Sequence, residues 1–500
     1  VYRFVAAHRP LFHRLSLWLW GKDYAPPRFE RVSWLFLRAI GLIYFAAFVS
    51  FGVQALGLIG SNGILPLSDF ITALNQHFGA RRYWFFPMLF WLNVSDFAIQ
   101  ASCWAGAALS LLVVFKVLPR LSLLLLYLLY LSLFYAGQDF MTFQWDLLLL
   151  EAGFLALLLS TGSRLGIWLL RWLLFRLMFL SGAVKLLSGD PSWADFSALG
   201  YHFMTQPLPT PLAWYAQHLP QSALRFATGA TFFIELALPF LIFCPRRLRF
   251  AAACGFLLLQ ATILLTGNYN FFNLLTLALC LCLFDDQALA RLLPLKPGRT
   301  LEMPGKIAAR VVAAFALLIA LVSSAQLYSV FSGRTWAPWL NNGVAPLRIV
   351  NTYGLFAVMT TERPEIIIEG SNDGKHWLEY SFKYKPGDVR RAPAWNIPHQ
   401  PRLDWQMWFA ALDGQAQHPW FGHFLQRLLE NSPEVIALLD GNPFPGKPPR
   451  YVRALLYDYR YASAQERKTP GLWWKRQLTG IYYPAVELRH AAPGGARDPA

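Results

Sequence analysis

Nine runs of apolar residues divide the first two-thirds of the sequence, and they constrain the fold more than any other feature. A helix needs about 20 apolar residues to cross the hydrocarbon core of a bilayer. The chain as a whole is 56% hydrophobic and 14% charged, a composition typical of membrane proteins. We therefore predict a polytopic α-helical membrane bundle of about nine spans over residues 1–331. The expected spans are approximately 33–59, 97–115, 121–136, 146–161, 167–187, 226–244, 250–266, 271–284 and 311–331.

The basic residues lie mainly in the short connections between these runs. The chain has a formal net charge of +16, and residues 1–331 carry 24 Lys and Arg against 13 Asp and Glu. A nucleic-acid-binding protein gathers such residues on one contiguous face. Here they form separate loop clusters, so we expect the lipid bilayer as a partner and not nucleic acid.

The distribution of these basic residues also predicts the orientation of the chain. If the N-terminus is cytoplasmic, the cytoplasmic segments of nine spans hold 17 Lys and Arg, and the opposite segments hold two or three. Positive residues remain on the cytoplasmic side of a membrane, and an even number of spans would break the asymmetry. We expect a multi-pass protein whose 188–224 loop and C-terminal domain both lie outside the cytoplasm.

After residue 331 the pattern changes to that of a folded extracytoplasmic domain, expected over residues 332–489. A run that alternates around Asp373-Gly374 predicts a β-hairpin between residues 364 and 384. We expect an α+β, β-sandwich-like domain followed by a disordered tail at 490–500. Further elements are expected as helices at 421–430 and 434–439 and as a strand at 450–461. The domain contains no cysteine, so no disulfide can stabilise it.

Seven ionisable residues interrupt the apolar runs, where each costs about 2.5–3.5 kcal/mol at the bilayer centre. They are Arg38 and the six candidates for a polar site, Asp146, Glu151, Arg171, Arg176, Lys185 and Glu235. One interpretation is that they form buried ion pairs that fix helix packing. The other is a polar pocket in which Lys185 acts as a base or binds a carboxylate. We expect Glu235 to be paired with Lys185 or Arg176, since an isolated carboxylate at that depth is too costly. Arg176 and Lys185 are nine residues apart, which puts them on opposite faces of one helix.

Two segments of the C-terminal domain are rich in aromatic and basic residues, the types that are enriched at protein interfaces. The candidates for binding a partner protein are His399, Arg402, Asp404, Trp405 and Arg453. The alternative is that the aromatic residues form the domain core. The sequence contains none of the nucleophile, phosphate-binding or dinucleotide-binding motifs, and no histidine spacing typical of a metal site. We therefore name no catalytic residue, no metal and no cofactor.

Several long stretches resemble the lipase maturation factor family. They are FQWDLLLLEAGF (143–154), FRLMFLSGAVK (175–185), GNYNFFNL (267–274), VNTYGLFAVMTTERP (350–364), PHQPRLDWQMWF (398–409) and the segment 451–459. The resemblance implies a membrane protein that helps exported lipases to reach an active fold. Animal members lie in the endoplasmic reticulum membrane with a lumenal C-terminus. Met204 stands where relatives carry Glu, so no role of that carboxylate is transferred to this chain.

The short loops and the Ala-, Leu- and Arg-rich spans suggest a bacterial member of that family. In that setting the expected location is the inner membrane, with the C-terminal domain in the periplasm. The membrane part is also distantly similar in fold to vitamin K-dependent γ-carboxylase, which is an enzyme, and this similarity is one of fold alone.

Two functions therefore remain open at this point. The first is a factor that assists the folding or assembly of exported, lipase-like client proteins. The second is a membrane enzyme with an intramembrane polar pocket that acts on a lipid-soluble or exported substrate. The lack of a recognisable catalytic constellation favours the first.

The orientation can be tested with reporter fusions placed after residues 215 and 340. Because both positions follow an odd number of expected spans, both reporters should show an exported signal. A cytoplasmic signal from the second fusion would mean that the number of spans is even.

Overall fold

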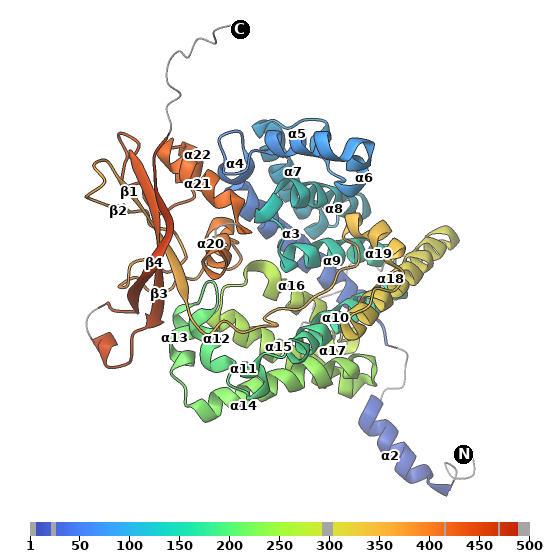
Figure 1. Ribbon diagram of the computed structural model, residues 1–500. Coiled ribbons are helices and arrows are strands. Elements are labelled where there is room, and N and C mark those ends of the chain that lie inside the picture. The colour runs from blue at the N-terminus through green and yellow to red at the C-terminus, as the bar shows by residue number, and fades with distance from the viewer. Residues whose placement is uncertain (1–6, 22–26, 293–303, 415–416, 469–470, 489–500) are drawn as a thin grey trace.

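The computed structural model describes residues 7–21, 27–292, 304–414, 417–468 and 471–488. The first two-thirds of the chain are helical, and the last third adds a small antiparallel sheet and several short helices. Three of these helices are α20 (Arg402–Leu412), α21 (Pro419–Leu429) and α22 (Pro433–Ile436). Figure 1 shows the sheet at one flank of the helical part, with α20 to α22 between the two. The predicted order of a helical bundle followed by an α+β region is confirmed.

Seven helices among the described residues are long and apolar enough to cross a membrane. They are α3 (Glu30–Gly52), α7 (Asp96–Val114), α8 (Pro119–Ala136), α10 (Arg164–Leu187), the run Gln221–Phe243, α15 (Arg246–Thr266) and α18 (Lys306–Ser332). The protein is therefore a multi-pass membrane protein.

Two of the nine expected spans form helices that are shorter than a bilayer core. These are α9 (Gln144–Ser160), with 17 residues, and α16 (Asn270–Leu281), with 12 residues. At a rise of about 1.5 Å per residue they extend over roughly 25 Å and 18 Å, against about 30 Å for a hydrocarbon core. All nine segments are helical, but helix length alone does not confirm a count of nine spans.

The sixth long run changes its helical geometry halfway. It consists of α14 (Gln221–Phe232), the π-helical turn η4 (Phe233–Ala237) and the 3₁₀-helix η5 (Leu238–Phe243). Pro239 has no amide hydrogen, so it cannot donate to the carbonyl of Glu235 four residues earlier. The regular α-helical ladder is therefore interrupted at the turn that carries Glu235.

Short helices occupy most of the connections between these runs. The α-helices are α2 (Arg9–Trp20), α4 (Ala55–Ile59), α5 (Leu67–Phe78), α6 (Arg82–Phe85), α11 (Pro191–Ala194), α12 (Leu199–Thr205), α13 (Pro211–Gln217), α17 (Asp286–Leu292) and α19 (Pro338–Val344). The 3₁₀-helices are η1 (Gly79–Arg81), η2 (Leu89–Trp91), η3 (Gln138–Phe140), η6 (Ala345–Leu347) and η8 (Glu466–Lys468).

The sheet has four antiparallel strands in the order β2-β1-β3-β4. The strands are β1 (Pro364–Ser371), β2 (Leu378–Glu379), β3 (Tyr451–Tyr461) and β4 (Trp474–Val486). The predicted hairpin and the predicted strand at 450–461 are confirmed, whereas β4 was not expected. The second hairpin strand is short and ends at Glu379. Farther along the chain, the Asp404 carboxylate accepts the backbone amides of Tyr384 and Lys385, both at 2.9 Å, so these two amides do not pair with a strand.

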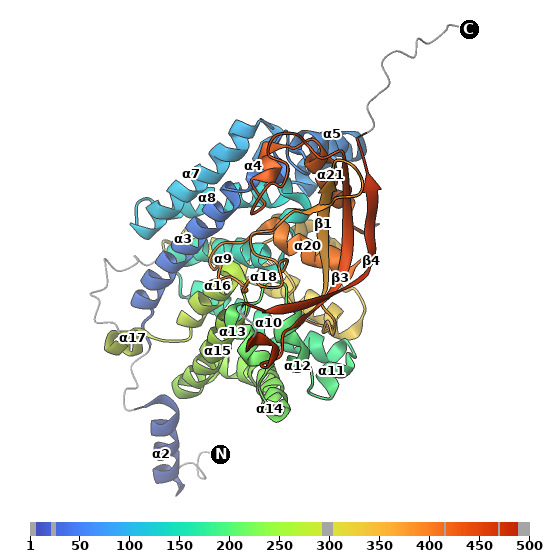
Figure 2. The same ribbon diagram turned by 90° about the vertical axis from the view of Figure 1, so that its left-hand side faces the viewer.

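The expectation of a β-sandwich is wrong for the described part of the domain, which contains a single sheet. Helix α20 contacts β1 and α21 contacts β3, so helices cover the face where a second sheet was expected. Figure 2 shows α20 between the sheet and the membrane helices. Alternating residues in a strand indicate that one face is covered, but they do not indicate what covers it.

The predicted domain boundary coincides with the end of α18, yet the segment that follows does not join the sheet directly. Residues 345–354 lie against the bundle, where Tyr135 donates to the Pro346 carbonyl at 2.8 Å and Tyr127 donates to the Leu347 carbonyl. The division at 331/332 stays a prediction. The expected tail at 490–500 lies outside the described residues.

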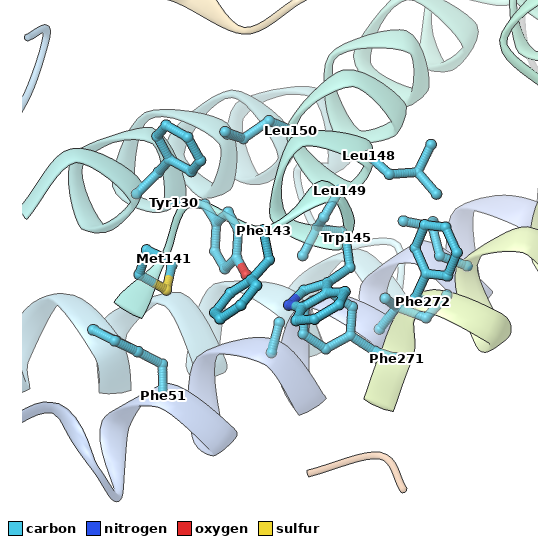
Figure 3. Packing of buried hydrophobic residues seen from close by; sticks show 14 of the residues in the cluster. Phe51, Tyr130, Met141, Phe143, Trp145, Leu148, Leu149, Leu150, Phe271 and Phe272 are labelled. Carbon is cyan, nitrogen blue, oxygen red and sulfur yellow. The ribbon is translucent and has the colours of Figure 1, made fainter. Parts of the chain in front are cut away.

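The apolar core continues from the bundle into the C-terminal domain without a break. Phe143 and Trp145, at the start of α9, stack with ring centroids 4.5 Å apart. Figure 3 shows the two rings next to each other among the buried residues of the cluster. The ring of Trp405 from α20 completes the cluster, 4.7 Å from that of Trp145. Aromatic residues from both parts of the chain therefore form one core.

The close contact between α4 of the membrane part and α22 of the C-terminal domain can be tested by a substitution at Gly57. A Cβ added at Gly57 would overlap the Glu434 carbonyl oxygen and lie 2.9 Å from Leu438 Cγ, whereas one added at Gly305 would meet nothing within 4 Å. Because the overlap is with backbone, Gly57→Ala should destabilise the protein by about 1–3 kcal/mol. Thermal unfolding of the detergent-solubilised protein should show a lower Tm for Gly57→Ala and an unchanged one for Gly305→Ala. Equal Tm values would contradict the tight contact.

Candidate functional site

A buried ion pair between Asp146 of α9 and Arg402 of α20 joins the membrane bundle to the C-terminal domain. The guanidinium binds both carboxylate oxygens, at 2.6 and 2.8 Å, and both side chains are at most 1% exposed. Tyr130 donates to the same carboxylate at 2.6 Å, and Arg402 also donates to the Phe140 carbonyl at 3.0 Å. Such a bidentate, charge-assisted pair fixes the position of α20 on the bundle.

This arrangement corrects the expectation that the 398–405 segment forms an exposed binding surface. Arg402, Asp404 and Trp405 are all buried, because α20 lies between the sheet and the bundle. His399 is half-buried and lies 3.0 Å from the Ser50 hydroxyl of α3 through its Nδ1 atom. The alternative interpretation, that the aromatic residues belong to the core, holds for Trp405.

The remaining client-binding candidate, Arg453 on β3, has a different environment. Its guanidinium pairs with Glu369 of β1 at 2.7 Å and lies 4.0 Å from the centre of the Trp377 ring. The Arg453 side chain is 30% exposed, so it can be reached from solvent. Its role in client binding stays a prediction.

A second buried pair, Glu151 of α9 with Arg176 of α10, holds the segment that precedes the sheet. Glu151 accepts from the Asn351 backbone amide at 2.9 Å and from the Tyr353 hydroxyl at 2.7 Å. Arg176 donates to the Asn351 carbonyl at 2.9 Å. Two of the predicted intramembrane carboxylates, Asp146 and Glu151, therefore bind parts of the C-terminal region.

Arg171 belongs to neither pair, although it is on the same helix as Arg176. Its Nε donates to the Cys282 carbonyl at 2.8 Å, and its guanidinium lies 4.9 Å from the centre of the Phe29 ring. It thus links α10 to the end of α16, at the opposite end of α10 from Lys185.

Sequence reasoning missed Arg363, which is fully buried at the start of β1. Its guanidinium donates to the carbonyls of Met204 and Gln206, at 2.6 and 2.5 Å, and to that of Pro207 at 2.9 Å. It also pairs with Glu365 at 2.8 Å. The carboxylate of Glu365, two residues further along, could have indicated an ion pair. The backbone carbonyls that accept the other hydrogen bonds cannot be identified from a sequence. The contact at position 204 uses the backbone, so the Met in place of Glu does not affect it.

Four connections of the membrane part contact the C-terminal domain through hydrogen bonds. In the first, Ser432 donates to the Asn62 carbonyl at 2.8 Å, and in the second, Arg402 reaches Phe140. In the third, Trp214 donates to the Ala462 carbonyl at 2.8 Å, and the carbonyls that accept from Arg363 belong to the same connection. In the fourth, Asn268 donates to the Ala394 carbonyl at 2.7 Å. The C-terminal domain therefore covers one end of the bundle (Figure 1).

The predicted pairing of Glu235 with a basic residue is confirmed, and this third buried ion pair lies apart from the other two. Lys185 Nζ of α10 is 2.6 Å from a carboxylate oxygen of Glu235, on the π-helical turn η4. Arg176 binds a different carboxylate, as expected from opposite helix faces. The pair borders a cavity of about 120 Å³, which is lined mainly by apolar side chains. The described residues contain no group of three or more side chains that could hold a metal ion.

These features define a class of protein, a polytopic membrane protein whose C-terminal α+β domain is attached to one end of the bundle by buried ion pairs. The lipase maturation factor transmembrane domain matches residues 31–291, and the lipase maturation factor C-terminal domain matches residues 349–484. The chain belongs to the lipase maturation factor family.

Individual relatives agree with this assignment. Lipase maturation factor 2 of Homo sapiens is 36% identical, and that of Xenopus laevis 35%, each alignment covering 91% of this chain and 82% of the relative. Lipase maturation factor 1 of Bos taurus is 34% identical, over 90% of this chain and 88% of the relative. No solved structure matches the chain. These names agree with the maturation-factor hypothesis and not with the membrane-enzyme alternative.

The Asp146–Arg402 pair can be tested with a double-mutant cycle. Asp146→Leu or Arg402→Met alone leaves a buried charge without its partner, so each should cost about 3–5 kcal/mol of stability. The double variant should recover part of that loss, because it removes both charges together. Thermal unfolding of the solubilised protein measures the effects. The matched control is Arg460→Met, whose exposed pair with Asp458 should contribute at most about 1 kcal/mol. Strictly additive losses would show that the pair does not couple the two parts.

Proposed function

We propose that this protein assists the folding or assembly of exported, lipase-like proteins, with its C-terminal domain outside the cytoplasm. The observation that carries the proposal is the match of both parts of the chain to proteins named lipase maturation factors. The geometry supports a role of the C-terminal domain as a rigidly held platform, because buried ion pairs join it to the bundle.

The proposed orientation is supported by the connections that contact the domain. In a nine-span topology with a cytoplasmic N-terminus, the outer connections follow the first, third, fifth and seventh spans. The four connections with hydrogen bonds to the domain follow α3, α8, α10 and α15. These are the same four. A domain on one side of a membrane can contact only the connections on that side, so the 188–224 loop and the domain share a side.

The same contacts favour nine crossings over seven. If α9 and α16 did not cross, the connections around Trp214 and Asn268 would lie on the side opposite to the loop around Asn62. The domain contacts all three. We therefore propose that α9 and α16 cross the bilayer in spite of their length. Their side chains are mostly buried among other helices and so need not match the lipid thickness.

The compartment follows from the orientation. In a bacterial cell the domain would lie on the periplasmic side of the inner membrane, and in a eukaryotic cell in the lumen of the endoplasmic reticulum. Newly exported polypeptides arrive in both places, which suits a protein that acts on exported clients.

We place the client contact on the solvent-facing side of the sheet around Arg453. The buried position of Arg402, Asp404 and Trp405 makes them residues that position the domain. Arg453 lies at 30% side-chain exposure beside Trp377, and Arg and Trp are the residue types that contribute most to protein interfaces. His399, half-buried against α3, is assigned to domain docking as well.

Deletion of the gene, followed by complementation, tests the proposal. The amount and the activity of secreted lipase should both be measured, and the deletion should lower the activity per molecule, with wild type restoring it. Arg453→Glu should restore less than half of the wild-type activity, because it reverses a charge on the proposed client face. Lys475→Glu, a matched reversal at the exposed pair with Glu466, should restore it fully. Normal specific activity of lipase in the deletion strain would overturn the proposed function.

A further inference from the structure

The cavity beside Lys185 and Glu235 has no part in the docking of the C-terminal domain by the other two ion pairs. It lies between α10, α11, α12, the α14–η4 run, α15 and α16, and Leu355 and Phe356 from the C-terminal part of the chain complete its wall. Its volume is about 120 Å³. An apolar cavity of about 150 Å³ holds a molecule the size of benzene. The space here is somewhat smaller, so it admits no more than a small polar group with the first carbons of one alkyl chain.

The most exposed of the residues that line the cavity lies on a candidate membrane span. Among its lining residues Thr262 of α15 is exposed, and Thr231 of α14 and Ile263 of α15 are half-buried beside it. An exposed position on a membrane-spanning helix faces lipid, so the opening leads sideways into the bilayer. A ligand that enters by this route comes from the lipid phase.

The wall of the cavity carries two polar groups with unused hydrogen-bonding capacity. Lys185 Nζ donates to Glu235 at 2.6 Å and to the Ser181 carbonyl at 3.1 Å, which uses two of its three protons. Asn273 is 1% exposed and donates to Gln260 at 2.7 Å, while its buried side-chain oxygen has no hydrogen-bond partner among the described residues. The Asn273 oxygen is thus available to a ligand as an acceptor, and the third proton of Lys185, whose Nζ lies 5.2 Å from the centre of the Trp193 ring, is available as a donor.

The cavity wall as a whole carries no net charge. The positive charge of Lys185 is balanced by Glu235. His202 of α12 also lines the cavity, and burial, with a smaller effect of Lys185, lowers its pKa to about 4, so it is uncharged at neutral pH. A phosphate group would bring a negative charge next to the Glu235 carboxylate without a free cation to balance it. A neutral ligand avoids this cost.

We propose that this cavity binds a neutral glycerolipid from the bilayer. Its ester and hydroxyl oxygens lie against Lys185 and Asn273, the start of one acyl chain fills the apolar space, and the rest of the lipid extends past Thr262 into the membrane. The inference concerns a binding site only, and it does not rest on the proposed function.

The test is a binding titration of the purified full-length protein in detergent with labelled dioleoylglycerol. We expect saturable binding near one equivalent and no competition by a tenfold excess of dioleoylphosphatidylglycerol. Thr262→Trp should weaken binding at least tenfold, because it closes the opening, and Asn273→Leu should weaken it similarly by removing the acceptor. Leu258→Trp is the matched control, one turn earlier on α15, where Leu258 is 66% exposed and does not line the cavity. It should bind like wild type.

Three outcomes would overturn the proposal. The first is the absence of saturable dioleoylglycerol binding to a folded protein. The second is equal competition by the anionic lipid, which would show that the site does not select a neutral head group. The third is wild-type binding by Thr262→Trp. Because lipase activity is not measured, none of these outcomes bears on the proposed function. Conversely, evidence against the proposed function would not argue against this binding site.

Discussion

The structure depends on the need to stabilise the charged groups that its helices bury. An isolated ionised group is very costly in an apolar interior, and an opposite charge together with hydrogen-bond partners offsets much of that cost. Asp146 meets this need with Arg402, which comes from α20 in a different part of the chain, 256 residues away. Once the pair is made, α20 cannot leave the bundle without exposing two charges to an apolar surface. The link between membrane part and C-terminal domain is therefore a consequence of electrostatics.

The same principle explains how the C-terminal domain is held against one end of the bundle. Glu151 accepts three hydrogen bonds from the residues 351 and 353, and Arg363 donates to carbonyls of the 204–207 segment. In each case a side chain of the membrane part or of the C-terminal domain forms hydrogen bonds with donors or acceptors of the other. Around these pairs, aromatic rings such as Trp145 and Trp405 exclude water, which strengthens the pairs further. The Lys185–Glu235 pair differs, since it lies entirely within the membrane part and borders a cavity.

Prediction from sequence succeeded where local pattern determines the outcome, and it failed where distant segments meet. The apolar runs, the hairpin around Asp373-Gly374 and β3 are read directly from periodicity. The pairing of Glu235 was predicted because a carboxylate at that depth requires a cation, and few cations were available. The burial of Arg402 was not foreseen. A segment that combines an Arg with aromatic residues has the same composition at a protein interface as in a core. Only the position of Asp146 in the fold shows that this segment belongs to the core.

By itself, the sequence determined that this chain is a multi-pass membrane protein of the lipase maturation factor family with a small α+β region at its end. Hydropathy and family motifs are properties of consecutive residues, so no tertiary information was needed. The tertiary structure decided that the covering layer of the sheet is helical, that Arg402 and Arg363 are buried anchors, and that Lys185 and Glu235 border a cavity. These features arise from contacts between segments far apart in the chain. Local periodicity carries no record of such contacts, because many partners would satisfy the same buried charge or cover the same apolar face equally well.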